Sequence, residues 1–366
     1  MFHKTRQKFT VLFAALAATC LLVVPGCGDD SSSDTTEALS TTTVALATTT
    51  TVTPTTTVAP EPVEKPLIVV TTNILGDVVG KAVGDLFDVE TIMPSGADPH
   101  VFQASAKQVD RMMKADLLVV NGANFEEGLL DVIKGAESDG VKVFEAIDSV
   151  DPLEDNDKEE GHDDHDEEGH DDHDKEEGHD DHHGHDHGGV DPHFFTDPGR
   201  MAQVVKQLSD FLVLNFPEID EKDLVSHMTD YSKKLEDLDS EVMQTLSSIP
   251  TGSRVMVTNH EVFAYFAESY EFEILGTIIP SSSTLSNTSA KDLVDLAEKM
   301  KAEGVPAVFV DASSSDALAE ALAGEVDGVE VVSLFSESLG AENTAGSTYI
   351  DMVRTNSELI ASALTG

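Results

Sequence analysis

The feature that most constrains this chain is an alternation of strand-like runs with helical segments, which occurs twice. In the first half, the short apolar or β-branched runs lie at residues 67–72, 88–93, 116–120 and 141–144. After residue 250 they lie at residues 254–258, 272–277, 307–311 and 330–334, and the first helical segment of this half is expected at residues 261–269. Strands that alternate with helices predict parallel sheets covered on both faces. We therefore expect an α/β protein with two parallel-sheet lobes.

A long amphipathic segment separates the two halves. Between Leu224 and Leu246 its apolar residues recur at intervals of three and four, and charged residues occupy the other faces. This spacing predicts one helix of about 27 residues, ~40 Å long. Pro217 precedes it and Pro250 ends it. Such a helix could pack along both lobes and hold them at a nearly fixed angle, or it could belong to one lobe as an ordinary amphipathic helix.

The N-terminus has the pattern of an export signal. Three basic residues, Lys4, Arg6 and Lys8, precede a 16-residue apolar run at 9–24. This run is shorter than the ~20 residues that a membrane-spanning helix needs. A basic start, a short apolar stretch and small residues favour a secretory signal over a membrane anchor.

The end of this signal resembles a bacterial lipoprotein box, with Gly26 directly before Cys27. The resemblance implies that residues 1–26 are removed and that Cys27 carries the lipid. Residues 27–65 are rich in Thr, Ser and Pro, a composition that cannot bury a core and predicts a disordered linker. Cys20 would leave with the signal, so the mature chain would have no cysteine pair for a disulfide.

The chain is strongly acidic, and its charge is unevenly distributed. It has 22 Lys and Arg against 69 Asp and Glu, a formal net charge of −47. Nucleic-acid binding needs clustered basic residues, which are lacking here, so a nucleic-acid partner is excluded. The acidic balance fits a solvated surface or cationic partners.

A tract rich in His and Asp interrupts the first lobe within residues 151–189. It repeats a unit close to Gly-His-Asp-Asp-His-Asp and has no apolar residue between 161 and 187. Its histidines are His162, His165, His170, His173, His179, His182, His183, His185 and His187. Such tracts bind divalent metals through imidazole, and the cost of ordering a loop keeps the affinity modest. We expect an auxiliary, low-affinity metal-binding loop; the alternative is a solvated acidic loop with incidental histidines.

Three histidines outside the tract lie where strands end or helices begin. His100 and His193 each end an Asp-Pro-His triplet, and His260 follows the strand-like run at 254–258. Ligands of open α/β sheets gather outside the carboxyl ends of strands, so these histidines suggest one shared cleft site. Three imidazoles and a carboxylate are a donor set that Zn²⁺ prefers. A single histidine at such a junction is more often a cap or a surface residue, and the repeated triplet is what favours metal binding.

Several motifs together resemble one family of bacterial proteins. They are Thr71-Thr72-Asn73-Ile74, Gly96-Ala97-Asp98-Pro99-His100, Asn121-Gly122, Asp191-Pro192-His193, Val257-Thr258-Asn259-His260, Phe263-Ala264-Tyr265-Phe266 and Ser347-Thr348-Tyr349-Ile350-Asp351-Met352. Over roughly residues 66–366 the chain resembles the zinc- and manganese-binding lipoproteins that serve ATP-driven metal importers. The resemblance implies two lobes joined by a long rigid helix, with the metal in the cleft between them. The corresponding segments are a lobe at 66–218, the helix at 219–249 and a lobe at 250–366.

The resemblance also implies the metal ligands. His100 and His193 would bind from the first lobe, and His260 from the second. The position of His260 is His in zinc-type members and usually Glu in manganese-type members. The fourth ligand is commonly an Asp in a Leu-Phe-Ser-Asp-like run, where this chain has Glu337.

Glu337 departs from the family pattern by one methylene group. Its carboxylate must fold back or bind at a shifted angle to replace that of Asp. Asp311 and Asp316 are the other candidates for the fourth ligand.

We therefore expect a protein on the outer face of the cell membrane, or in the periplasm, that captures Zn(II) and delivers it to an ABC permease. Four protein ligands leave no open position for an activated water, so we expect no enzyme activity. Manganese or iron is the main alternative ion, although hard Mn²⁺ favours more oxygen ligands. A surface adhesin or metal buffer is a second alternative. A zinc hydrolase is a third, but no nucleophile elbow or His-Glu-x-x-His motif is present.

Overall fold

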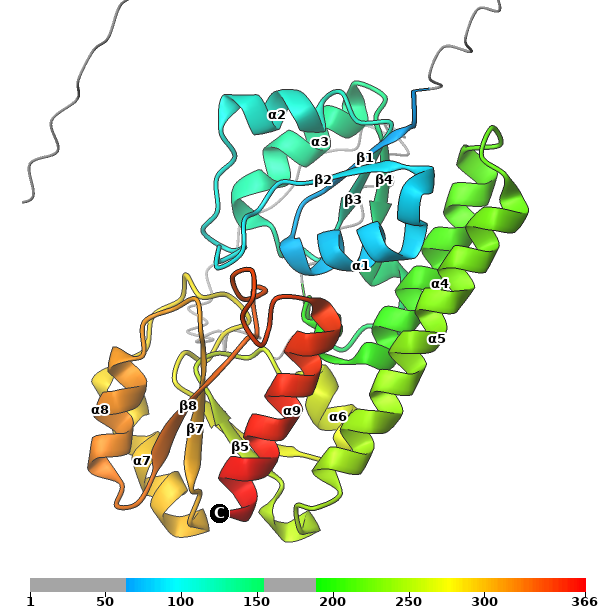
Figure 1. Ribbon diagram of the computed structural model, residues 1–366. Helices are drawn as coiled ribbons and strands as arrows, with labels where there is room; N and C mark the ends of the chain where they lie inside the picture. Colours follow the sequence, from blue (N-terminus) through cyan, green and yellow to red (C-terminus); the bar gives the residue numbers. More distant parts are fainter. Residues whose placement is uncertain (1–63, 155–188) are drawn as a thin grey trace, which may run out of the picture. The chain divides into compact units, whose positions relative to one another are not determined.

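The computed structural model describes residues 64–154 and 189–366 (Figure 1). The predicted signal, Cys27, nearly all of the linker and the histidines of the tract lie outside the described residues. In the part of the chain that is described, no helix is long and apolar enough to cross a membrane.

The first lobe is built on a four-stranded parallel sheet with the order β2-β1-β3-β4. Its strands are β1 (Leu67–Val70), β2 (Asp88–Thr91), β3 (Leu117–Val120) and β4 (Lys142–Glu145). The two central strands read Leu-Ile-Val-Val and Leu-Leu-Val-Val, as expected for strands buried on both faces. The helices of this lobe are α1 (Asn73–Val83), α2 (Ala106–Met112) and α3 (Leu130–Ser138).

The second lobe repeats this arrangement with the order β6-β5-β7-β8. Its strands are β5 (Val255–Thr258), β6 (Glu273–Thr277), β7 (Ala307–Asp311) and β8 (Glu330–Leu334), and its helices are α6 (Ala264–Tyr270), α7 (Ala290–Glu303), α8 (Ala317–Glu325) and α9 (Tyr349–Thr365). All strand pairs are parallel, so the predicted α/β fold with two parallel-sheet lobes is confirmed. Short 3₁₀ helices lie at Gly84–Leu86, Glu127–Leu129, Ala146–Ser149, Phe194–Thr196 and Thr251–Ser253.

Two long helices, α4 (Pro198–Asn215) and α5 (Glu221–Leu246), connect the lobes (Figure 1). Asp197 caps α4 by accepting bonds from the backbone N–H groups of Gly199 and Arg200. The apolar stripe predicted for α5 is buried along its whole length. Because α5 packs against α1 and α4 and also against α9 of the second lobe, it is a strut shared by both lobes and not a helix of one.

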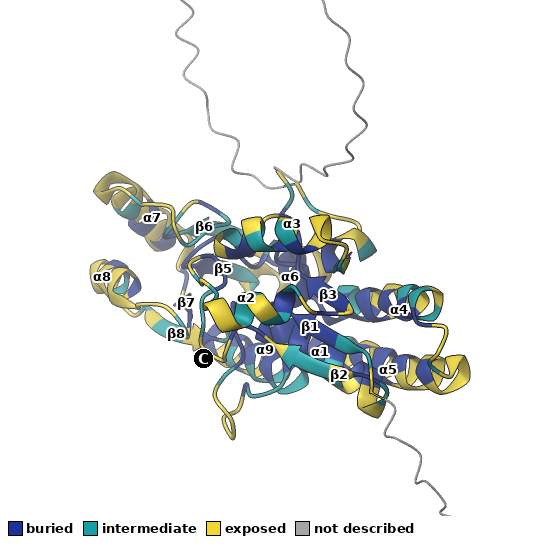
Figure 2. Ribbon diagram, turned by 90° about the horizontal axis from the view of Figure 1, so that it is seen from above, coloured by how far each residue is buried: buried dark blue, intermediate teal, exposed yellow. Residues whose placement is uncertain are grey.

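A continuous apolar core runs through this strut. One cluster of buried side chains includes Ile68 of the first sheet, Leu235 of α5, Phe309 of the second sheet and Tyr349 of α9. Figure 2 shows the buried residues on central strands such as β1 and β3 and on the inner faces of the helices, with exposed residues on the outer faces. One apolar cluster therefore spans both lobes, and each lobe also has a separate cluster of its own.

The start of α6 differs from the sequence prediction, which began a helix at residue 261. The hydroxyl of Thr258 donates to the carbonyl oxygen of His260, at 2.7 Å. The backbone N–H of Glu261 donates to the carbonyl oxygen of Ser281, at 2.9 Å. These bonds hold residues 259–263 in a turn after β5, so the helix begins at Ala264.

Candidate metal centre

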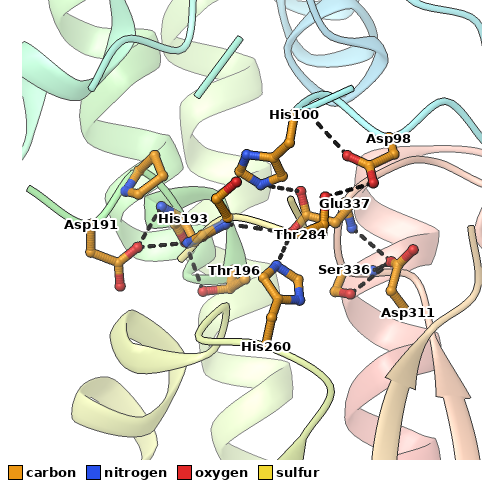
Figure 3. A network of polar contacts seen from close by, with 12 residues as sticks. Asp98, His100, Asp191, His193, Thr196, His260, Thr284, Asp311, Ser336 and Glu337 are labelled. Atoms are coloured by element: carbon orange, nitrogen blue, oxygen red, sulfur yellow. Dashed lines mark hydrogen bonds and ion pairs between the residues drawn. The ribbon is translucent and has the colours of Figure 1, made fainter. Parts of the chain in front are cut away.

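Four side chains converge between the lobes: His100, His193, His260 and Glu337 (Figure 3). One donor atom from each lies within 4.8 Å of the donor atoms of the other three. All four residues are buried, with exposed fractions of 3%, 0%, 0% and 1% respectively. The site residues predicted from the sequence are thus brought together.

Each lobe supplies two of these side chains. His100 lies in the loop after β2, and His193 directly precedes the 3₁₀ helix at Phe194–Thr196. His260 follows β5, and Glu337 follows β8. Three of the four positions therefore lie beyond the carboxyl ends of parallel strands, where open α/β sheets form their ligand sites.

Three of the distances between donor atoms are close to those around a tetrahedral ion. Glu337 Oε1 lies 3.0 Å from His260 Nε2 and 3.5 Å from His193 Nε2, and Glu337 Oε2 lies 3.6 Å from His100 Nε2. Two donors that bind one Zn²⁺ at ~2.0–2.1 Å in a tetrahedron are about 3.4 Å apart.

Three buried atoms in the site have no hydrogen-bond partner within the described chain: His100 Nε2, His193 Nε2 and Glu337 Oε2. A buried polar group without a partner is costly. A cation between them would satisfy all three at once.

The other ring nitrogen of each histidine contacts an acceptor. His100 Nδ1 lies 3.1 Å from Glu127 Oε1, His193 Nδ1 lies 2.7 Å from Asp191 Oδ1, and His260 Nδ1 lies 3.2 Å from Asn259 Oδ1. An acceptor at Nδ1 places the proton there and leaves the lone pair on Nε2. The three Nε2 atoms are therefore the ring atoms that face the carboxylate of Glu337, and they are the ones that would bind a metal.

An aromatic wall closes one side of the site. The ring of Phe125 meets those of His100 and His193 edge to face, with centroids 5.1 and 5.5 Å away. The chain reaches Phe125 through a turn in which Gly122, Ala123 and Asn124 all have positive φ angles of 86°, 50° and 58°. Such backbone favours glycine and is strained at Ala123.

The buried carboxylate of Glu126 anchors this turn. It accepts bonds from the hydroxyl of Thr71, at 2.6 Å, and the backbone N–H of Asn121, at 2.7 Å. Burial raises the pKa of Glu126. These bonds tie the turn to the carboxyl ends of β1 and β3, which holds the adjacent Phe125 in place.

Within the site, the carboxylates and the imidazoles shift one another's pKa values. Burial alone would lower the pKa of His100, but the hydrogen bond with Glu127 and the Glu337 carboxylate, 3.6 Å from Nε2, outweigh this and raise it to about 10. Burial would raise the pKa of Glu337, but the nearby charge of His193 and the contacts with His100 and His260 hold it well below its usual range. A cation that enters must therefore displace a proton from His100.

Both lobes fix the backbone at Glu337. Asp311 Oδ2 accepts from the backbone N–H of Glu337, at 3.0 Å, and from the N–H and hydroxyl of Ser336. From the first lobe, Asn73 accepts from the N–H of Leu339, at 2.8 Å, and donates to the hydroxyl of Ser338, at 2.7 Å. This framework fixes the backbone from which the carboxylate of Glu337 reaches the histidines.

The two other carboxylates considered for the fourth position do not join the cluster. Both oxygens of Asp311 already accept hydrogen bonds. Oδ2 accepts from Ser336 and Glu337, and Oδ1 accepts from the backbone N–H of Ser313, at 2.7 Å. Asp316 is exposed at the start of α8. Sequence reasoning missed the roles of Glu127, Asn259 and Asp311. Asn259 stands beside His260 in a motif, but no local signal connects Glu127 to His100.

Comparison with known proteins agrees with this geometry. Residues 68–363 match the family described as "Zinc-uptake complex component A periplasmic". The chain belongs to this family. It is 28% identical over 306 residues to the zinc-binding protein TroA of Treponema pallidum, covering 82% of this chain and 89% of TroA. It is 26% identical over 312 residues to the manganese ABC transporter substrate-binding lipoprotein PsaA of Streptococcus anginosus, covering 82% and 90% of the two chains.

The solved structure of TroA has the same fold. It superimposes with a TM-score of 0.68 at 26% identity and covers 82% of this chain and all of TroA. The family resemblance predicted from the motifs is therefore confirmed: TroA is named as a zinc-binding protein, and PsaA as the substrate-binding lipoprotein of a manganese ABC transporter. Because relatives named for zinc and for manganese both occur, the choice of ion depends on the donors of each chain.

Proposed function

We propose that this protein captures Zn(II) outside the cytoplasm and delivers it to an ABC permease. The observation that carries the proposal is the buried convergence of three imidazole Nε2 atoms with one carboxylate, His100, His193, His260 and Glu337. Zn²⁺ accepts such a nitrogen-rich tetrahedral set. Mn²⁺ prefers oxygen donors, and Glu337 supplies at most two.

The arrangement supports binding and not catalysis. Four protein donors fill a tetrahedral shell, and a catalytic zinc needs an open position for water. The donors are also buried, which leaves little room for a substrate beside the ion. We expect no hydrolysis of ester or phosphoester substrates by the zinc-loaded protein; turnover that disappears with His260→Ala would instead favour a hydrolase.

We further propose how the chain is organised around the site. Removal of residues 1–26 would leave Cys27 lipidated, and the linker at 27–65 would hold the body away from the outer face of the membrane. Residues 66–218 and 250–366 would form the two lobes, joined through the helix at 219–249. The tract within 151–189 would collect ions at low affinity beside the cleft.

Metal stoichiometry and affinity test the proposal. We expect a chain that lacks residues 155–188 to retain one Zn²⁺ in competition with a chelator, and Mn²⁺ in excess not to displace it. His193→Ala should abolish this binding. His227→Ala is the matched control, because His227 is exposed on α5 away from the cluster. If no tight ion remains without the tract, the protein is a low-affinity surface metal buffer or adhesin.

Manganese transport is the second candidate function. It is favoured by the similarity to PsaA and by the carboxylate of Glu337, whose two oxygens could both bind one ion. Displacement of Zn²⁺ by equimolar Mn²⁺ would support it.

A further inference from the structure

The carboxylate of Glu127 connects the metal-binding cluster to the opposite lobe. A single oxygen, Oε1, lies 3.1 Å from His100 Nδ1 and accepts a bond from the hydroxyl of Ser283, at 2.5 Å. Glu127 belongs to the first lobe, and Ser283 to the loop between β6 and α7 of the second. The same atom therefore orients a candidate ligand and contacts the other lobe.

A second bond joins the same loop to the other side of His100. The hydroxyl of Thr284 donates to Asp98 Oδ2, at 2.8 Å, and Asp98 Oδ1 accepts from the backbone N–H of His100, at 2.9 Å (Figure 3). We call residues 281–286 the cleft-mouth loop. Two successive hydroxyl groups of this loop thus contact two carboxylates that flank one histidine.

These contacts differ from the deeper ones between the lobes. Asn73 and Ser338 are buried, and they adjoin the apolar core that the lobes share. The side chain of Glu127 is 34% exposed, and Leu285 beside Ser283 and Thr284 is 54% exposed. The cleft-mouth loop can therefore separate from the first lobe without disturbing the core.

We propose that Glu127 is a positioning residue for His100, and that through Ser283 it latches the cleft-mouth loop across the entrance of the metal site. The inference rests on the proposed metal-binding function. A metal at Nε2 makes the Nδ1–H of an imidazole a better donor, so its bond to Glu127 strengthens. Glu127 is then held where the hydroxyl of Ser283 reaches it, so the bound ion favours the closed position of the loop. Because such coupling is reciprocal, the closed loop must also favour retention of the ion.

The rate of zinc release into excess chelator tests this latch on the full chain. Zinc on the histidine tract leaves in a fast phase, and the cleft ion in a slow one. We expect Ser283→Ala to speed the slow phase about tenfold, the factor that one hydrogen bond to a charged group provides. Glu127→Ala should speed it at least as much, and the double variant should release no faster than Glu127→Ala alone.

Two further variants separate this role from a general loss of structure. Thr284→Ala breaks the other contact of the loop, so its effect should multiply with that of Glu127→Ala. Glu127→Gln keeps an acceptor oxygen, so it should restore most of the slow release. Nitrogen NMR of the zinc-loaded protein should show the His100 Nδ1–H signal shifted by Glu127→Ala, a change that a merely structural role would not produce.

The outcomes distinguish this inference from the function on which it rests. If the wild-type chain has no slow phase, both fail. If the wild type retains zinc but Glu127→Ala and Ser283→Ala release it at the wild-type rate, the latch alone is overturned. The latch is also overturned if the double variant speeds the slow phase by the product of the factors for Glu127→Ala and Ser283→Ala. The two groups would then act separately.

Discussion

Zinc affinity should depend steeply on pH, because a proton on His100 competes with the ion. The contacts with Glu127 and Glu337 raise the pKa of His100 to about 10 from 6.5. Below the raised pKa, each pH unit multiplies the affinity by about ten, so His100 alone contributes about 100-fold between pH 6 and 8. With the ordinary pKa, the same interval would contribute only about fourfold.

Chelator competition at pH 6, 7 and 8, corrected for protonation of the chelator, measures this slope. Calorimetry in buffers of different ionisation enthalpy counts the protons released. At pH 7 we expect about one proton per zinc from His100, against about 0.2 if its pKa were ordinary. Glu127→Ala removes one of the two bonds that raise the pKa, so it should reduce the proton count. The reasoning would be refuted if the zinc affinity rose only about fourfold between pH 6 and 8 and about 0.2 protons were released per zinc.

Three other perturbations have defined outcomes. Asp311→Asn should weaken zinc binding about 10–100-fold without removing a ligand, because it loosens the backbone at Ser336 and Glu337. Asp316→Asn is the control, since Asp316 is exposed at the start of α8, and it should leave the affinity unchanged in the same competition assay. Leu235→Ala should lower the free energy of unfolding by about 2–5 kcal/mol in urea denaturation, and Met243→Ala, half exposed on the same helix, should lower it far less. Without metal, protonated His100 stabilises the fold fully below pH 6.5, so the melting temperature should fall as pH rises toward 10. Saturating zinc should remove this pH dependence. A melting temperature that does not change with pH in the absence of zinc would count against the charge interaction of His100 with Glu127 and Glu337.

Much of the fold could be predicted from the sequence because the central strands of the first sheet are continuous apolar runs. The central strands β1 and β3 are buried on both faces, so each has an unbroken apolar signal. The start of α6 could not be predicted. Its first expected turn is held open by a bond from Glu261 to Ser281, a residue that follows the next strand.

The candidate site could be predicted in part for a similar reason. His100 and His193 stand in a repeated triplet that is visible along the chain. The carboxylates that contact the imidazole Nδ1 atoms differ in how close they lie along the chain. Asp191 is two residues from His193, whereas Glu127 reaches His100 from the loop after β3. Contacts of the second kind depend on how the two loops pack, which no local pattern encodes.

The apolar cluster that both lobes share has a consequence for how the chain resists proteolysis. Because Ile68, Leu235 and Phe309 belong to one cluster, the body should unfold in a single cooperative transition and not lobe by lobe. An ion bound between the lobes stabilises that whole unit in proportion to the logarithm of its concentration. Scarcity of the metal would then expose every part of the body to proteases together, so that resistance to digestion would report the metal supply.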